Sequence, residues 1–155
     1  MTEKEINEYL DMAENAAKNS TCLRANYGSV IVKNGEVLSF GYNDVPYGRP
    51  TCKQLGYCIK EKLKIPHGDG YSKCRAICSE QNAIIKAMPD ELVDSYLFLV
   101  GMDPVTKDYL NDPKPCPVCE RFIINARIKE VYVRLTKDTF KVLKTKDFID
   151  YDTSF

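Results

Sequence analysis

The sequence has no long apolar run, no excess charge of either sign and no secretory signal, and each absence excludes a class of protein. No apolar stretch is long enough to cross a bilayer, which excludes a membrane-spanning protein. The first residues, Met-Thr-Glu-Lys-Glu, lack the basic start and apolar stretch of a signal peptide, so we expect a cytoplasmic protein. The 22 basic and 22 acidic side chains cancel, so no long-range field attracts a nucleic acid polymer. These absences favour a small-molecule substrate.

Cysteine, in contrast, is abundant. The chain has seven cysteines in 155 residues. An odd number of cysteines without an export signal argues against a disulfide framework and favours thiolates that bind metal. The hydrophobic fraction of 44% and the charged fraction of 28% are those of an ordinary globular protein. The length is that of one domain, so we expect residues 1–155 to form a single domain.

Apolar periodicity and turn residues predict alternating helices and strands. Thr2 and Glu5 form a capping box that opens an amphipathic helix over 2–18. Asn34-Gly35 predicts a two-residue hairpin turn. Together, the predicted elements are a helix over 2–18, strands over 28–33 and 36–42, a long loop over 43–73, a helix over 78–88, a strand over 96–101, a helix from about Pro117 and a strand over 131–134. This order predicts an α/β sandwich around one mixed sheet.

Two short runs carry the residue types of a catalytic zinc site. Cys78-Ser79-Glu80 begins one predicted helix, and Cys116 and Cys119 begin another. Helix N-termini favour thiolate over thiol, and cysteines three residues apart can share one tetrahedral ion. Three thiolates leave a fourth position open for water, and Glu80 can take the proton of that water without binding the metal. The pattern predicts zinc held by Cys78, Cys116 and Cys119, with Glu80 as the catalytic acid and base.

These runs match a known signature. C-S-E followed by P-C-P-V-C is the three-cysteine variant of the H-x-E and P-C-x-x-C signature of zinc deaminases that act on nucleobases. C-R-A-I-C-S-E-Q-N-A-I, P-C-P-V-C-E-R-F-I-I-N-A and the earlier C-L-R-A-N-Y-G-S-V resemble motifs of the cytidine and deoxycytidylate deaminase superfamily, over approximately residues 20–133. The chain looks like the deoxycytidylate deaminase branch, with Cys78 where that branch has histidine.

The resemblance implies a fold, an activity and roles for residues. It implies a three-layer α/β/α domain with a central mixed sheet of about five strands, and hydrolysis of dCMP to dUMP and ammonia. Asn43 would hydrogen-bond the sugar hydroxyl, and Ser79 would belong to the substrate site. Family members often assemble, so a homo-oligomer is expected. The segment 102–114 is longer than the family's usual link and is expected to reshape the substrate pocket.

A second metal site is a further hypothesis. Some relatives hold a structural zinc before the catalytic motif, and the candidate ligands here are Cys22, Cys52, His67 and Cys74. A second ion would stabilise the long loop, which has little apolar content. The alternative is that these are buried thiols beside an ordinary loop histidine.

The sequence leaves several functions open. One alternative is deamination of another base or nucleoside, such as cytidine, guanine, or a pterin or riboflavin precursor. Another is a zinc-binding module without catalysis, although a purely structural site has no use for Glu80 so close to a ligand. A transfer-RNA adenosine deaminase is disfavoured by the zero net charge.

Overall fold

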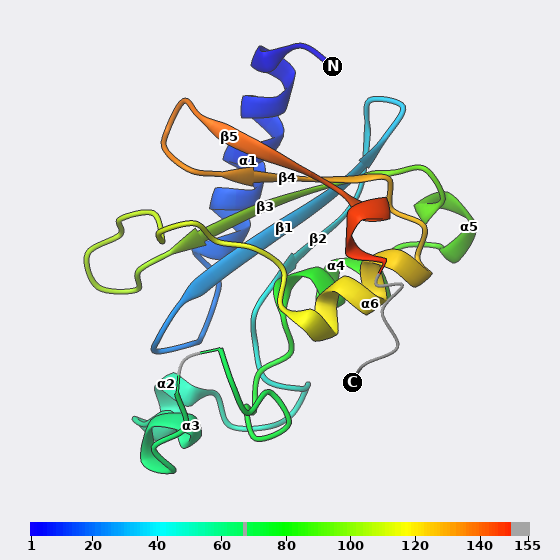
Figure 1. The fold of residues 1–155 in the computed structure, drawn as a ribbon. Helices are drawn as coiled ribbons and strands as arrows, with labels where there is room; N and C mark the ends of the chain where they lie inside the picture. The colour runs from blue at the N-terminus through cyan, green and yellow to red at the C-terminus, as the bar shows by residue number, and fades with distance from the viewer. Residues whose placement is uncertain (67, 150–155) are drawn as a thin grey trace.

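The computed structural model describes residues 1–66 and 68–149, and five strands of this part of the chain form one mixed sheet (Figure 1). The strands are β1 (Asn26–Lys33), β2 (Glu36–Tyr42), β3 (Tyr96–Met102), β4 (Glu130–Arg134) and β5 (Phe140–Lys144), in the order β2-β1-β3-β4-β5. Strands β3 and β4 are parallel, and the other neighbours are antiparallel. The predicted mixed sheet is therefore confirmed.

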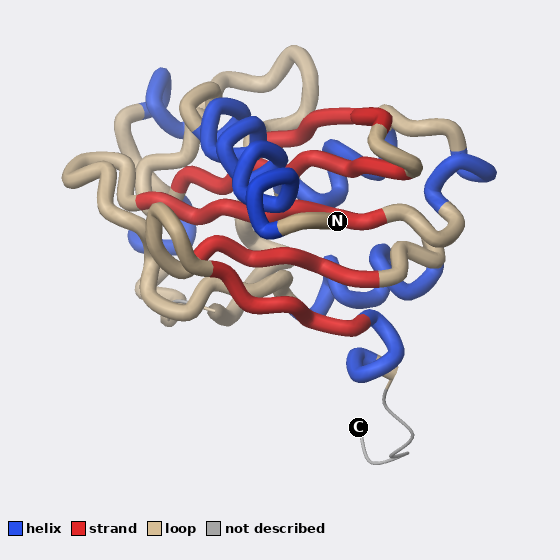
Figure 2. Tube along the Cα trace, turned by 90° about the horizontal axis from the view of Figure 1, so that it is seen from above, coloured by secondary structure: helices blue, strands red, loops and turns tan. Residues whose placement is uncertain are grey.

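Helices cover both faces of the sheet. The helices are α1 (Glu3–Ala17), α2 (Cys52–Leu55), α3 (Ile59–Lys62), α4 (Ser79–Ile85), α5 (Pro89–Leu92), α6 (Pro117–Asn125) and the 3-10 helix η1 (Thr145–Phe148). Helix α1 crosses one face, whereas α4 and α6 lie on the other (Figure 2). This arrangement confirms the three-layer α/β/α architecture. None of the described helices is long and apolar enough to cross a membrane.

Alternate residues of β1 build the two cores. Val30 and Val32 pack in the cluster beneath α1, and Ile31 between them packs in the cluster beneath α4 and α6. Two glycines let the strands approach the helices closely. A Cβ on Gly28 would lie 1.9 Å from the Ala13 carbonyl oxygen, and a Cβ on Gly41 would lie 2.1 Å from the Ser79 carbonyl oxygen. The start of α4 is therefore fixed directly against β2.

Local sequence signals account for the first elements. The Thr2 hydroxyl accepts from the Glu5 N–H at 3.2 Å and the Glu5 carboxylate accepts from the Thr2 N–H at 2.8 Å, which completes the predicted capping box. Asn34 and Gly35 have φ angles of 52° and 78°, as the predicted hairpin turn requires. These two predictions are confirmed.

Several parts of the chain differ from the prediction. The helix predicted over 78–88 ends at Ile85, and α5 and η1 were not predicted. The predicted loop over 43–73 contains α2 and α3, each four residues long. Such short helices give no repeating apolar pattern, although Thr51 and Gln54 form a capping box that marks the start of α2. Strand β5 was not predicted because it is a partly exposed edge strand, in which lysines flank the apolar residues.

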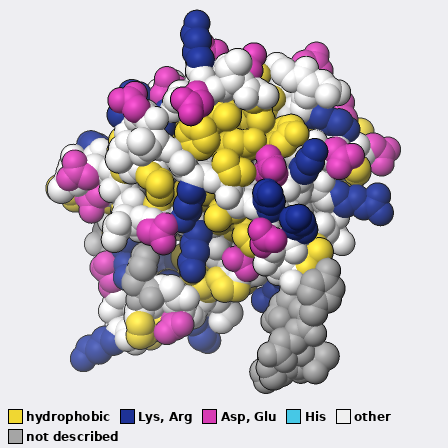
Figure 3. Space-filling model, turned by 45° about the horizontal axis from the view of Figure 1, so that its top comes forward, with side chains coloured by type: hydrophobic (Ala, Val, Ile, Leu, Met, Phe, Trp, Pro, Cys, Tyr) yellow, Lys and Arg dark blue, Asp and Glu magenta, His cyan; other side chains and the backbone are white. Residues whose placement is uncertain are grey.

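A buried ion pair joins the C-terminal half of the sheet to α1. The Arg134 side chain is fully buried and donates to Asp11 at 2.7 Å and to Glu14 at 2.9 Å. Beside this contact, α1 leaves part of the sheet face uncovered, where the half-buried Phe140 packs on Tyr132. Apolar side chains gather on this side of the molecule (Figure 3). The active-site elements lie on the opposite face.

Candidate active site

Three cysteine sulfurs meet where α4 and α6 begin. Cys78 is the N-cap of α4, Cys116 is the N-cap of α6, and Cys119 lies in the first turn of α6. The three sulfurs lie within 4.8 Å of one another, with 3.9 Å between Cys78 and Cys116. Tetrahedral zinc with bonds of about 2.3 Å separates its sulfur ligands by about 3.8 Å. Within residues 1–66 and 68–149, this is the one group of three or more potential ligands so closely placed.

The charge balance of the cluster also fits a cation. The pKa of the Cys116 thiol is lowered, first by hydrogen bonds from Cys119 and Cys78 and also by backbone N–H groups. The pKa values of Cys78 and Cys119 are raised by their hydrogen bonds to Cys116 and by burial. One thiolate therefore forms at the expense of the other two. A bound divalent cation removes this conflict, because it stabilises all three thiolates together.

Backbone and side-chain donors orient the sulfurs. The Cys119 N–H donates to the Cys116 sulfur at 3.4 Å, as expected at the start of a helix. The Gln81 amide donates to the Cys119 sulfur at 3.6 Å and so links α4 to α6. The cluster is thus held by both helices that contribute cysteines.

Glu80 is an acid buried beside the sulfurs. Its side chain belongs to α4, and the residue is only 4% exposed. Burial raises the pKa of Glu80 to about 7, although a 3.0 Å hydrogen bond from the Ser79 hydroxyl acts in the opposite direction. Ser29 on β1 hydrogen-bonds the Ser79 hydroxyl at 2.7 Å and completes the chain of contacts. A carboxyl group with a pKa near neutrality can both accept and return a proton.

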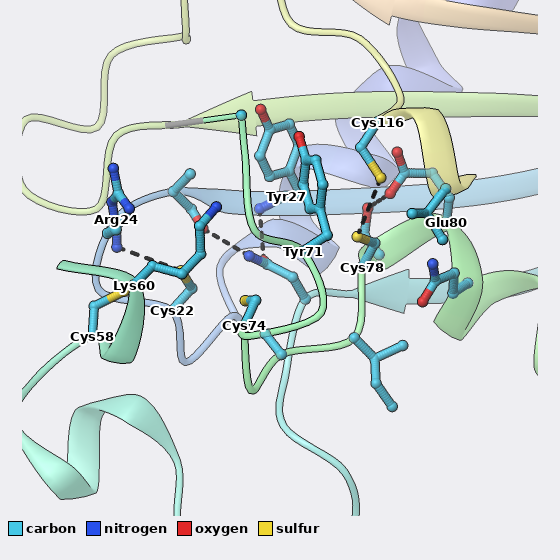
Figure 4. Close-up of a pocket in the computed structure, with 18 of the residues that line it drawn as sticks. Cys22, Arg24, Tyr27, Cys58, Lys60, Tyr71, Cys74, Cys78, Glu80 and Cys116 are labelled. Carbon is cyan, nitrogen blue, oxygen red and sulfur yellow. Dashed lines mark hydrogen bonds between the residues drawn. The ribbon is translucent and has the colours of Figure 1, made fainter. Parts of the chain in front are cut away.

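A cavity of about 410 Å³ opens beside this cluster. Figure 4 shows Cys78, Cys116 and Glu80 at one end of it and Arg24 and Lys60 at the other. The aromatic rings of Tyr27 and Tyr71 lie between the two ends (Figure 4). The cavity therefore has a reactive end, an aromatic middle and a basic end.

Asn43 lines the same cavity and is held firmly. Its side-chain oxygen accepts from the Ser20 hydroxyl at 2.5 Å and from the Tyr27 N–H at 2.9 Å. Its amide nitrogen donates to the Ala25 carbonyl at 2.8 Å. These three bonds orient the amide, and among the described contacts they use one of its two N–H groups.

The candidates for a second metal site are only partly brought together. Cys22 and Cys74 line the basic half of the cavity. The pKa of Cys52 is raised first by burial and then by Cys22, Cys58 and Cys74, so these thiols lie in one neighbourhood. Their sulfurs do not form a described group as tight as the one at Cys78. His67, the fourth candidate, lies outside the described residues, so the second site stays a prediction.

Several cavity residues were not identified from the sequence, among them Arg24, Tyr27, Lys60 and Tyr71. Arg24 and Tyr27 belong to the motif R-A-N-Y, which was matched to the family without assigning them a role. Nothing in the spacing distinguishes Tyr27 and Tyr71 from the other tyrosines of the chain, and Lys60 lies in a segment predicted as loop.

The segment 102–114 contributes little to the cavity. Its last residue, Lys114, is its one member among the described lining residues. Tyr109 instead donates to Glu14 of α1 at 2.7 Å, on the far side of the sheet.

Comparisons with known proteins identify the family of the chain. The family model of the cytidine and deoxycytidylate deaminase zinc-binding region matches residues 3–135. The chain is 28% identical over 123 residues to the deoxycytidylate deaminase of Schizosaccharomyces pombe and covers 34% of that protein's length. It is 28% identical over 134 residues to that of Mycobacterium phage D29, which it covers to 95%. The alignments include 79% and 84% of this chain.

A solved structure shares the fold. The apo dCMP deaminase of cyanophage S-TIM5 superposes with a TM-score of 0.60 at 27% identity, over 88% of this chain and 86% of the phage enzyme. Since the family model spans strands β1 to β4 together with α4 and α6, the chain belongs to the cytidine and deoxycytidylate deaminase family.

Proposed function

We propose that this protein is a zinc-dependent hydrolase that deaminates dCMP to dUMP and ammonia, as a single domain over residues 1–155. The observation that carries the proposal is the buried Glu80 carboxyl beside three clustered cysteine sulfurs in one cavity. The sequence relatives are deoxycytidylate deaminases, and the S-TIM5 enzyme has also been crystallised with dCMP and dUMP.

Cys78, Cys116 and Cys119 would hold the zinc. Bound zinc supplies a Lewis acid that lowers the pKa of a water molecule at its open position. Glu80 accepts a proton from the attacking water and passes it to the ring nitrogen of the base. Once the water oxygen has bonded to the ring carbon that bears the amino group, Glu80 takes the remaining proton of that hydroxyl and delivers it to the amino group. The carbon–nitrogen bond then breaks, so that dCMP and water yield dUMP and ammonia. Its pKa near 7 suits both directions of transfer.

Other cavity residues position the nucleotide. Burial raises the pKa values of the Tyr27 and Tyr71 phenols, which therefore stay neutral and can pack on the base. The oriented Asn43 amide donates its second N–H to the sugar hydroxyl. Ser79 acts on the substrate indirectly, because its hydroxyl is bonded to Glu80 and Ser29.

According to this proposal, the protein binds a single nucleotide as its substrate and does not bind a nucleic acid polymer. Net charge is zero, and the basic residues Arg24 and Lys60 lie together at one end of the cavity. A homo-oligomer in the cytoplasm remains our prediction. Light scattering of the purified protein measures the assembly directly, and a monomer at micromolar concentration would contradict it.

We further propose a second, structural zinc held by Cys22, Cys52, His67 and Cys74. The proximity of Cys22, Cys52 and Cys74 supports it. Metal analysis should find two zinc ions per chain and one in Cys52→Ser. One zinc per chain that is unaffected by Cys52→Ser would show that the second site does not exist.

The substrate is tested by the loss of the cytosine absorbance. Zinc-loaded protein should deaminate dCMP with a higher kcat/KM than CMP, deoxycytidine or cytidine. Glu80→Gln is the matched control, because its amide keeps the shape of the carboxyl but cannot carry protons. A higher kcat/KM with another base or nucleoside would identify that compound as the substrate. Zinc binding without turnover of any base would favour the alternative of a zinc-binding module without catalysis.

A further inference from the structure

The basic end of the cavity contains a lysine that is buried although it is charged. Lys60 belongs to α3 and is 7% exposed, yet it lines the cavity. Lysine is almost never buried unless it is paired, because removing an ammonium group from water is costly. The environment of Lys60 must therefore supply a compensating interaction, either from the protein or from a ligand.

Among the described contacts of Lys60, the one that its ammonium group makes with the protein is weak. Lys60 Nζ lies over the ring of Tyr71, 4.9 Å from its centroid. None of the ion pairs found within residues 1–66 and 68–149 includes Lys60. The ring leaves the ammonium hydrogens available to an anion in the cavity.

The neighbourhood of Lys60 also suits an anion. Arg24 lines the same end of the cavity, and its Nε lies 3.3 Å from Glu61, a carboxylate with a 61% exposed side chain. Both cations lie across the cavity from Cys78 and Cys116, with Tyr71 between the ends (Figure 4).

We propose that Lys60 binds the phosphate of the substrate and determines selectivity for a nucleoside monophosphate over the free nucleoside. The inference rests on the proposed function, because the base must lie at the cysteine end for its phosphate to reach the basic end. Tyr71 then has two contacts, since its ring packs beside the base and beneath the Lys60 ammonium. Lys60 is a specificity residue that takes no part in the proton transfers of Glu80.

The test compares two substrates in three variants. Lys60→Met keeps the apolar stem and removes the charge, Lys60→Arg restores the charge, and Lys62→Met is the matched control. Lys62 lies on the same helix, with its Nζ 4.7 Å from the ring centroid of Tyr57, and does not line the cavity. For each protein, kcat and KM are measured with dCMP and with deoxycytidine.

Lys60→Met should raise the KM for dCMP by about 10- to 100-fold, as for the loss of a charged hydrogen bond, with kcat nearly unchanged. Its turnover of deoxycytidine should equal that of the wild type. Lys60→Arg should recover part of the loss, and Lys62→Met should behave as the wild type. Inorganic phosphate should compete with dCMP in the wild type and should have little effect on Lys60→Met.

Equal losses on both substrates would mean that Lys60 acts only on the fold, and an unchanged KM for dCMP would mean that it does not contact phosphate. Calorimetric titration with dCMP separates this inference from the proposed reaction. If the wild type binds dCMP through Lys60 but does not deaminate it, the phosphate site stands and the proposed function fails. If the wild type does not bind dCMP at all, both fail.

Discussion

The reactive end and the basic end of the cavity are built differently. The reactive residues begin α4 and α6, which pack on the sheet through a core of fully buried side chains such as Ala83 and Ile123. The basic end includes Lys60, from a segment over 44–77 that has two four-residue helices. This segment is closed at its base by paired backbone bonds between Asp44 and Ile77, at 2.7 and 3.2 Å. In the proposed mechanism, the proton transfers therefore take place on the packed framework, whereas the substrate is recognised by a segment with little regular structure.

The largest effect should come from removing a sulfur of the framework. Cys119→Ser should lose the catalytic zinc and with it all measurable turnover, because serine is a poor ligand for zinc and the other two sulfurs do not complete the site. Zinc analysis and dCMP assays measure this. Cys58→Ser, in the inserted segment, is the matched control and should keep the catalytic zinc. Full zinc content and activity in Cys119→Ser would remove Cys119 from the ligand set.

A substitution that keeps the zinc but prevents proton transfer shows whether the catalytic step and the binding of dCMP depend on different residues. Glu80→Gln should lower kcat by roughly 10²- to 10⁴-fold, with zinc content and the affinity for dCMP retained. Single-turnover assays and dCMP titration measure the two properties. A loss below about tenfold would exclude Glu80 as the main acid and base.

The two close-contact glycines test whether the framework positions the site. A methyl group on either Gly41 or Gly28 would collide with a helix backbone. Gly41→Ala and Gly28→Ala should each destabilise the fold by about 1–3 kcal/mol, because the helix must move away. Only Gly41→Ala should also weaken zinc binding, since Gly41 contacts α4 whereas Gly28 contacts α1. Chemical denaturation and zinc titration compare the variants, and equal zinc affinities would contradict this account.

The smallest effect should come from the far side of the framework. Burial tends to raise the pKa of Asp11, but hydrogen bonds from Arg134 and Lys137 lower it overall. A lowered folded-state pKa contributes stability above the unfolded-state value of about 3.9, and this contribution is lost as the pH falls through the folded-state pKa. Because Asp11 is half-exposed, Asp11→Asn should cost less than about 1 kcal/mol at pH 7.

Unfolding midpoints across pH measure that contribution. The wild type and Asp11→Asn should converge at acidic pH, and the KM for dCMP should be the same in both. A difference in stability that persists at acidic pH would assign the effect to packing rather than to charge.

The same division explains what could be predicted from sequence. The hairpin turn at Asn34-Gly35 and the helix starts near Cys78 and Pro117 are local, because their residues interact within a few positions of the chain. The clustering of Cys78 with Cys116 and Cys119 was expected from spacing and from resemblance to the family, although their role as ligands stays a prediction.

The basic end could not be predicted in this way. Lys60 is buried in the folded chain, where it lines the cavity with Cys22 and Arg24, and its helix is too short to give a periodic pattern. The rings of Tyr27 and Tyr71 meet the site only after folding, because each comes from a different element. Tertiary contacts, rather than local sequence, select these residues.

A crystal structure of the zinc-loaded protein, with data at the zinc absorption edge, tests the central claim most directly. It should place one zinc about 2.3 Å from the sulfurs of Cys78, Cys116 and Cys119, with solvent in the fourth position beside Glu80. Cys78 is the decisive ligand, because resemblance to the deoxycytidylate branch leads us to expect histidine at this position. Zinc bound with Cys78 turned away, or with a fourth protein ligand closing the site, would contradict the account.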